Sequence, residues 1–414
     1  MNVEVINTGS ELLIGQVINT NIGHLGRELL SLGLSINRQI TVPDGNGIKD
    51  VIGESIRRSD IILITGGLGP TEDDLTREMV SGFLGAKLTE DQAIVDSIRE
   101  RIESNGSTMR EINRKQAMVP DGAVVLKNDN GTAPGLYLKP NDKTEGAHIY
   151  LLPGPPKELM PIFQEQVIPL IKNALQERQL PIPSCVNTFF SGIGESELAS
   201  RIDKMLLDKK GTFDLGYCIK PGGVVVRCIG EAGIVSSVSK IIRKEFSENY
   251  IASDHASLPA TLVEELMKRK ETVAIAESCT GGAIASLITD ISGASKVFNF
   301  GFVTYANTAK NELLGVTSDD LNEFGAVSEP VVRSMAEGCM EKSGANYAIA
   351  VSGIAGPTGG TKEKPAGTVF IGIASHGKPT FVEEYCYRVG RLIFKEKVSM
   401  TAINLLRKRI LGLL

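Results

Sequence analysis

Short, uninterrupted apolar segments recur along this sequence, and each one leads directly into a turn rich in glycine, proline or hydroxyl residues. Residues 60–65 read Asp-Ile-Ile-Leu-Ile-Thr, and residues 147–152 and 347–352 form two further runs of this kind. Such runs are typical of strands that are buried on both faces, as in parallel sheets. Stretches with helical spacing, such as residues 21–32, separate them. This alternation predicts an α/β fold in which helices cover both faces of mainly parallel sheets.

The alternation occurs twice, with a different pattern between the two regions. Residues 1–176 form the first region, for which we expect an N-terminal α/β/α sandwich domain. Residues 177–253 begin with a proline-containing linker and then read strand, helix, strand, strand, helix, which predicts a small α+β module. Residues 254–414 return to the alternating pattern and predict a C-terminal α/β/α domain. A chain of 414 residues agrees with several domains, because single cores stop growing near about 250–300 residues.

The composition argues against several classes of partner. The formal net charge of −5 gives no general attraction to nucleic acid or to an anionic membrane. No apolar run reaches the roughly 18–20 residues that a membrane span needs. The first residues lack the basic and then apolar pattern of a signal peptide, so we expect a cytoplasmic location. The four histidines are scattered and no C-x-x-C pair occurs, so any bound metal should be a hard ion with oxygen ligands.

The most informative turn of the first region follows the strand predicted at residues 60–65. Gly66, Gly67 and Gly69 allow backbone torsions that other residues avoid, and they let main-chain N–H groups approach an anion closely. Pro70 and Thr71 then lead into a helix, whose first turn favours phosphate. A purely structural tight turn is the alternative interpretation.

Acidic residues follow the glycines. Glu72, Asp73 and Asp74 can complement the dipole of the helix, or they can hold a divalent cation that bridges phosphate oxygens. Two other polar turns, at residues 7–15 and 152–158, also follow predicted strands. Ligands of open α/β sheets bind at the carboxyl ends of strands, so we expect the three turns to line one edge of one sheet.

These three turns together resemble the N-terminal domain of the CinA family of competence/damage-inducible proteins. Residues 65–76 alone resemble the substrate loop of the molybdopterin-binding MoaB/MogA fold. The resemblance implies an ADP-ribose pyrophosphatase that depends on a divalent metal ion (Mg, Mn or Co), with Asp74 as the catalytic candidate. It assigns substrate contacts to Thr8, Gly9, Gly66, Gly67, Gly69 and Thr71, and metal contacts to Glu11, Asp73 and Asp74.

The third region places Ser278 between a predicted buried strand and a predicted helix. One interpretation is that Ser278 or Thr280 caps this helix. The other is that Ser278 is a nucleophile, with helix N–H groups nearby to stabilise an oxyanion. Cys279 is a rival nucleophile, although no histidine in this region has an evident partner motif.

A nucleophilic serine needs a base. His255 and His376 lie in a linker and in a predicted hairpin turn, so neither is attractive. Lys310 follows a predicted strand that ends at Tyr305, and a lysine can act as a base if desolvation lowers its pKa. The alternative is an ordinary solvated lysine at the start of a helix. A further strand ends at Ser352, which could bind substrate or pass a proton.

The third region closely resembles the nicotinamide-nucleotide amidase domain of the CinA family. The matching segments are residues 276–282, 301–305 with Lys310, 325–330 and 351–357. The resemblance implies that Ser278 attacks the carboxamide of nicotinamide mononucleotide and that Lys310 is the general base, with no cofactor. It assigns proton relay or orientation to Tyr305 and Ser352, and substrate binding to Thr280, Gly281, Gly353, Gly356 and Arg391. Family members often carry Asn or Asp before this arginine, whereas Gly390 stands here.

The middle module resembles the KH-like domain of long CinA proteins. Its residues 184–252 hold nine Lys and Arg against eight Asp and Glu, and the single G-x-x-G in this range, at Gly230–Gly233, contains a carboxylate. This argues against nucleic-acid binding and favours a spacer or dimerisation role. The family resemblance also implies a homodimer. Two other functional interpretations stay open at this point: only one catalytic domain, or a non-catalytic nucleotide-binding adaptor linked to competence or DNA damage.

Overall fold

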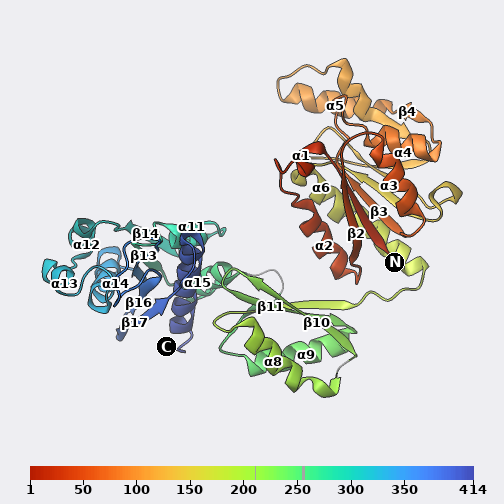
Figure 1. Ribbon diagram of the computed structural model, residues 1–414. Helices are drawn as coiled ribbons and strands as arrows, with labels where there is room; N and C mark the ends of the chain where they lie inside the picture. The colour runs from red at the N-terminus through yellow and green to blue at the C-terminus, as the bar shows by residue number, and fades with distance from the viewer. Residues whose placement is uncertain (210, 254–256) are drawn as a thin grey trace. The chain divides into compact units, whose positions relative to one another are not determined.

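The structure, a computed structural model, describes residues 1–209, 211–253 and 257–414 (Figure 1). The chain divides into two compact units, Met1–Cys185 and Val186–Leu414. The first unit contains a six-stranded sheet, and the second contains most of a four-stranded sheet and all of a five-stranded sheet. The domain boundary predicted at residues 253–254 adjoins the segment outside the described residues, and His255 lies within that segment. The three-domain division remains a prediction.

The sheet of the first unit has the strand order β2-β1-β3-β8-β7-β6. Its first four strands are parallel and the last two are antiparallel, so the prediction of a mainly parallel sheet holds for its larger part. These strands are β1 (Val3–Thr8), β2 (Ile36–Val42), β3 (Ile61–Thr65), β6 (Ala123–Leu126), β7 (Gly135–Leu138) and β8 (His148–Leu152). A separate antiparallel pair is formed by β4 (Leu88–Glu90) and β5 (Met118–Pro120).

Strand β3 shows why helices cover both faces of this sheet. Ile61 and Leu63 belong to one apolar cluster, whereas Ile62 and Ile64 belong to another, because successive side chains of a strand point to opposite faces. The first cluster packs against α2 (Asn21–Ser31), α6 (Pro156–Ile162) and α7 (Ile168–Glu177), and the second against α3 (Gly47–Ile56) and α4 (Thr76–Leu84). The other helical segments are α1 (Ser10–Leu13), α5 (Gln92–Ser104), η1 (Glu111–Ala117), η2 (Asp142–Thr144) and η3 (Phe163–Val167).

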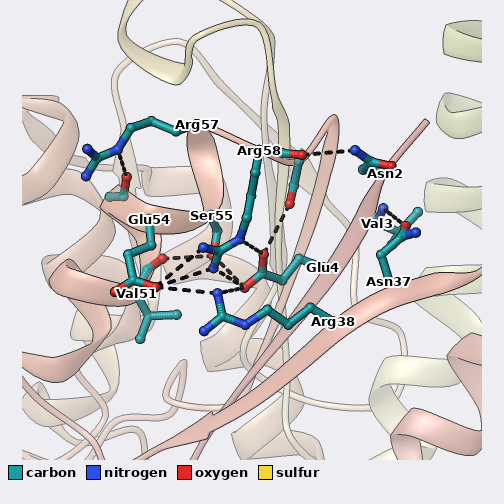
Figure 2. A network of polar contacts seen from close by, with 12 residues as sticks. Asn2, Val3, Glu4, Asn37, Arg38, Val51, Glu54, Ser55, Arg57 and Arg58 are labelled. Carbon is teal, nitrogen blue, oxygen red and sulfur yellow. Dashed lines mark hydrogen bonds and ion pairs between the residues drawn. The ribbon is translucent and has the colours of Figure 1, made fainter.

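A buried carboxylate stands at the beginning of β1. Glu4 is 1% exposed, and its two oxygens accept hydrogen bonds from Ser55 Oγ at 2.8 Å and Ser59 Oγ at 3.1 Å. Arg58 adds two more, from Nε and Nη2, each at 3.0 Å (Figure 2). These contacts fasten the end of α3 and the residues after it to β1, which lies next to the edge strand β2, at the opposite end of β1 from the turn that follows Thr8.

The four-stranded sheet has the order β10-β11-β9-β12. Its elements are β9 (Ser184–Phe190), α8 (Glu195–Met205), η4 (Leu207–Lys209), β10 (Phe213–Lys220), β11 (Gly223–Gly230), α9 (Ala232–Glu245) and β12 (Tyr250–Ser253). The predicted order of strand, helix, strand, strand and helix is confirmed. The structure adds β12, which pairs antiparallel with β9 and was not expected from the sequence.

The five-stranded sheet has the order β14-β13-β15-β16-β17, with the first three strands parallel and the last two antiparallel. Its strands are β13 (Val273–Glu277), β14 (Phe298–Val303), β15 (Tyr347–Gly353), β16 (Thr368–Ser375) and β17 (Lys378–Cys386). Its helices are α10 (Leu258–Arg269), α11 (Ala283–Thr289), η5 (Ala294–Lys296), α12 (Asn307–Leu314), α13 (Ser318–Glu323), α14 (Glu329–Ser343) and α15 (Arg391–Ile410). The α/β class predicted for this region is confirmed.

The two faces of β13 differ in side-chain size. Val273 and Ile275 belong to a cluster with residues of α10, α11 and α15. Ala274 and Ala276 face the other way and pack with α14, where small side chains let the helix lie close to the sheet. Both faces of the strand that leads to Ser278 are therefore covered.

Among the helices of the described residues, none is both long enough and apolar enough to span a membrane.

Candidate functional site

Ser278 and Lys310 meet at the end of β13. Ser278 follows the last residue of the strand, and its main-chain N–H donates to Val351 O at 3.0 Å, which fixes the start of the turn. Lys310 belongs to the first turns of α12, and its Nζ lies 3.2 Å from Ser278 Oγ. The structure thus brings the two predicted residues within hydrogen-bond distance of each other.

The environment of Lys310 is unusual for a lysine. The residue is 1% exposed, and Nζ donates to Thr304 O at 2.9 Å and Tyr305 O at 3.4 Å. No carboxylate among the described residues lies within 4.0 Å of Nζ. Burial lowers the pKa of Lys310, and the neighbouring Cys279 opposes this shift. Burial without a counter-ion favours the neutral amine, which is the form that can accept a proton.

The helix-capping interpretation of Ser278 and Thr280 is not supported, because Glu277 performs this role. Its buried carboxylate accepts the N–H groups of Gly282 at 2.9 Å, Ile284 at 3.1 Å and Ala285 at 2.9 Å. The first turn of α11 is therefore satisfied from the residue before the serine. The Ser278 hydroxyl remains directed to Lys310.

A cavity of about 220 Å³ opens over this pair. Of the predicted residues, Ser278, Tyr305, Lys310, Ser352, Gly353 and Arg391 line it. Arg391 Nη2 donates to the Tyr305 hydroxyl at 3.0 Å, and its Nη1 donates to Gly356 O at 3.2 Å. The guanidinium is thus held at the wall of the cavity, at the start of α15.

Three other predicted residues do not line this cavity. Thr280 is fully buried, Gly281 lies in the turn after Ser278, and Gly356 reaches the site only through its carbonyl oxygen. Ser352 lines the cavity while its hydroxyl donates to Ala326 O at 2.7 Å. Burial raises the pKa of the Cys279 thiol to about 12, which weakens its claim as a nucleophile, because the thiolate is the reactive form.

Sequence reasoning missed part of the wall of this cavity. Asn307, Ala326, Val327 and Ala355 also line it. Asn307 precedes Lys310 by one helical turn, a spacing that could have drawn attention to it. Ala326, Val327 and Ala355 lie within the segments 325–330 and 351–357 that resemble the family, but none carries a polar side chain that would single it out.

The first unit has a larger cavity, of about 540 Å³, at the carboxyl ends of its parallel strands. All three predicted turns contribute to it. The predicted residues that line it are Thr8, Gly9, Glu11, Gly66, Gly67, Gly69, Asp73 and Asp74. Thr71, which was also predicted, does not line the cavity. Its N–H donates to Asp74 Oδ2 at 2.9 Å, and its hydroxyl also donates to that oxygen.

The glycines of this site are required by close approaches. Gly66 has φ +99°, and a Cβ there would lie 2.8 Å from Thr8 Oγ1 and still closer to Thr8 O. Gly67 has φ +65°, and a Cβ there would collide with Thr76 Oγ1. Only glycine fits where the loop crosses β1 and α4.

The cavity collects more carboxylates than the sequence indicated. Asp44 and Glu158 join the three predicted acids in its wall. Burial raises the pKa of Asp44, and the nearby Glu11 and Asp73 raise it further, against hydrogen bonds from the main chain. Burial also raises the pKa of Glu158, although Asn128 Nδ2 donates to it at 2.7 Å. Asp44 follows β2, a strand that the sequence pattern did not reveal.

This donor set fits a hard divalent cation. Several carboxylates face one cavity, and the pKa of Asp44 is raised mainly by burial and further by the nearby carboxylates of Glu11 and Asp73. No three His, Cys, Asp or Glu side chains of the described residues are grouped closely enough to hold a metal by themselves. Mg²⁺ usually takes one or two carboxylates and completes its shell with water and substrate phosphate, so a preformed cage is not needed.

Comparisons with known proteins identify the domain families of the first and last regions. Residues 255–410 match the model of the CinA C-terminal domain, and residues 4–173 match that of the probable molybdopterin-binding domain. A solved structure of a competence/damage-inducible protein from Agrobacterium tumefaciens is 40% identical, with a TM-score of 0.36, and the match covers 36% of this chain and 92% of that one.

Two curated relatives match over nearly their whole length. A CinA-like protein of Akkermansia muciniphila is 44% identical over 403 residues, which cover 97% of this chain and 96% of the relative. A competence-damage inducible protein of Caldicellulosiruptor saccharolyticus is 40% identical over 422 residues, which cover 100% of both chains. With a MoaB-like first region and a CinA-type last region, this chain belongs to the CinA family.

Proposed function

We propose that the C-terminal region is an amidase that converts nicotinamide mononucleotide and water into nicotinate mononucleotide and ammonia. The observation that carries this proposal is the contact of 3.2 Å between Ser278 Oγ and the Nζ of a buried lysine that lacks a carboxylate partner. An amidase that uses serine as its nucleophile needs a base beside the hydroxyl, because the hydroxyl attacks a carbonyl effectively only when its proton is removed. The nicotinamide part of the substrate comes from the family resemblance.

The first half of the reaction forms an ester. Neutral Lys310 takes the proton of Ser278 as Oγ attacks the carboxamide carbon. Glu277 and Ser278 O already accept the N–H groups of residues 281, 282, 284 and 285, so the main-chain N–H groups of Cys279 and Thr280 are the candidate donors for the resulting oxyanion. The C–N bond then breaks, the protonated Lys310 gives its proton to the leaving nitrogen, and ammonia departs.

The second half hydrolyses this ester. Lys310, neutral again, takes a proton from water as the water oxygen attacks the ester carbon. The bond to Ser278 Oγ breaks, Oγ regains the proton, and the acid leaves as nicotinate mononucleotide. Arg391, joined to the Tyr305 hydroxyl at 3.0 Å on the cavity wall, would bind the phosphate of the nucleotide. Tyr305 and Ser352 are the candidates for orienting the substrate or relaying protons.

Ammonia release from nicotinamide mononucleotide tests this proposal. Ser278→Ala should reduce turnover by about 10³-fold or more, because covalent catalysis is lost. Ser343→Ala is the matched control, since the hydrogen bonds of this hydroxyl are all local: it donates to Cys339 O and Met340 O and accepts the N–H of Ala345. Equal turnover by Ser278→Ala and the wild-type protein would contradict a role of Ser278 as nucleophile.

For the N-terminal region we propose a pyrophosphatase that depends on a divalent metal ion (Mg, Mn or Co) and cleaves ADP-ribose into AMP and ribose 5-phosphate. The support is a cavity of about 540 Å³ that combines a glycine loop with several carboxylates. Asp74, Asp73 and Glu11 would hold the ion, which when bound neutralises the pyrophosphate and activates water. The residues of the loop would hold the phosphates in place.

Release of AMP from ADP-ribose tests the second activity. Chelation should abolish it, and Asp74→Asn should lower it by about 10²-fold or more while the amidase of the same chain is unaffected. Full activity in excess chelator would refute the metal assignment. The homodimer implied by the family resemblance is tested by light scattering on the full chain.

A further inference from the structure

The carbonyl groups of the glycine loop in the first unit are held by groups on α4 and η1. Gly67 O accepts the N–H of Thr76 at 3.1 Å, and Leu68 O accepts Arg77 Nη2 at 3.1 Å. Thr71 O accepts Lys115 Nζ at 2.7 Å. Three carbonyl oxygens of this short loop are therefore held by hydrogen bonds from α4 and η1.

This arrangement determines where the N–H groups point. The single cis peptide bond of the described residues is Gly356–Pro357, so the peptide units of this loop are trans, with C=O and N–H in opposite directions. Leu68 N–H and Gly69 N–H thus point away from Thr76 and Arg77. No acceptor within the described part of the chain takes either of these two N–H groups. The Leu68 side chain is packed in the core, so its main chain is what meets the cavity.

Arg77 is the centre of this arrangement. It is fully buried, and its Nη1 donates to Lys115 O at 2.7 Å while its Nη2 holds Leu68 O. Within the described residues, no carboxylate lies within 4.0 Å of its nitrogens, and Nε has no partner. A guanidinium is costly to bury without a carboxylate. Burial lowers the pKa of Arg77, yet an arginine stays charged at neutral pH.

We infer that Arg77 and Lys115 are positioning residues for anion binding: Arg77 holds the Leu68 carbonyl inward, so that Gly69 N–H, beside the Leu68 N–H that Thr76 sets, faces the pyrophosphate of the substrate. Lys115 supports this loop because its carbonyl accepts Arg77 Nη1 and its Nζ holds Thr71 O. The positive charge of Arg77 lies at Leu68 O, on the side opposite to Gly69 N–H. This inference rests on the proposed pyrophosphatase function of the same cavity. Neither residue is expected to touch the reacting atoms.

The test measures binding of inorganic pyrophosphate, with Mg²⁺ present, to the full-length chain by calorimetry. Lys115→Met, which removes a partly exposed side chain, should weaken binding at least threefold, and Arg77→Met at least tenfold. Arg77→Lys should restore part of the affinity, because it keeps the charge but cannot bridge two carbonyls. Thermal unfolding of each variant is recorded alongside.

Arg58→Met serves as the stability control. Arg58 binds Glu4 at the far end of β1, so this variant should lose thermal stability but keep its pyrophosphate affinity within twofold. Wild-type affinity in both Lys115→Met and Arg77→Lys, or affinity losses that simply follow stability across all variants, would overturn the inference. If the wild-type chain binds pyrophosphate as expected but does not cleave ADP-ribose, the proposed function fails and the inference stands.

Discussion

Two buried charged residues, Glu4 in the first unit and Lys310 in the second, illustrate different uses of burial. Each is 1% exposed. Glu4 accepts hydrogen bonds from two serines and from two nitrogens of Arg58, so its charge is compensated within the protein (Figure 2). Among the described residues, the hydrogen-bond partners of Lys310 Nζ are one hydroxyl, that of Ser278, and two main-chain carbonyls.

The two residues differ in whether an oppositely charged side chain pairs with them. A buried charge with a full set of partners is part of the scaffold, and removing one partner is costly. A buried amine without a carboxylate is held in a state that suits proton transfer, and such groups concentrate at functional sites. We therefore expect changes at Glu4 to alter stability alone, and changes at Lys310 to alter activity first.

Loss of the Lys310 amine should have the largest effect. Lys310→Met should reduce release of ammonia from nicotinamide mononucleotide by about 10³-fold, within the range attributed to general-base catalysis. The methyl thioether fills a similar volume, so the fold should persist by circular dichroism. Lys268→Met, on the last turn of α10, is the control and should keep wild-type turnover. Wild-type turnover by Lys310→Met would show that Lys310 is not the general base, and its burial would then have no catalytic role to contrast with Glu4.

The next effect concerns stability. Glu4→Gln should destabilise the first unit by about 3 kcal/mol, the lower end of the range for broken buried pairs, because Arg58 is partly exposed. Hydrogen exchange of the β1 and β3 amides measures this change locally. Turnover of nicotinamide mononucleotide should stay within twofold of the wild type. Unchanged exchange rates would mean that the Glu4 network contributes little to the stability of the sheet.

The smallest expected effect is the response of the amidase to pH. The active form of Lys310 is neutral, so kcat/KM should rise about tenfold per pH unit below the pKa of Lys310 and level off above it. Because burial lowers this pKa, the plateau should begin below the roughly 10.4 of a free lysine. A rate that falls with rising pH, or that levels off only above this value, would show that Lys310 is not the base.

The sequence was most informative about strands and the turns after them. The apolar runs at residues 60–65, 147–152 and 347–352 correspond to β3, β8 and β15, since strands buried on both faces leave a continuous signal. The pairing of Ser278 with Lys310 was implied by family resemblance, whereas the burial of Lys310 depends on contacts between elements that are distant in the chain.

Other site features had no local signal. The role of Glu277 was missed because a carboxylate at the end of a strand has no distinctive pattern, and only the turn brings it over the N–H groups of α11. Asp44 was missed because its strand, β2, has three exposed residues in a row and no continuous apolar run. Strand β12 escaped for a related reason, since four residues are too few to show a period.

The alanines that β13 presents to α14 also limit how this protein can change over time. Enlarging Ala274 or Ala276 would force α14 outward, whereas Val273 and Ile275 on the reverse side pack among larger, adaptable side chains. A saturation library across residues 273–276 should therefore accept changes in side-chain size at positions 273 and 275 but not at positions 274 and 276. The packing of α14 directly on β13 thus constrains the strand that precedes Ser278, and we expect sequence variation around the site to concentrate in the surrounding loops.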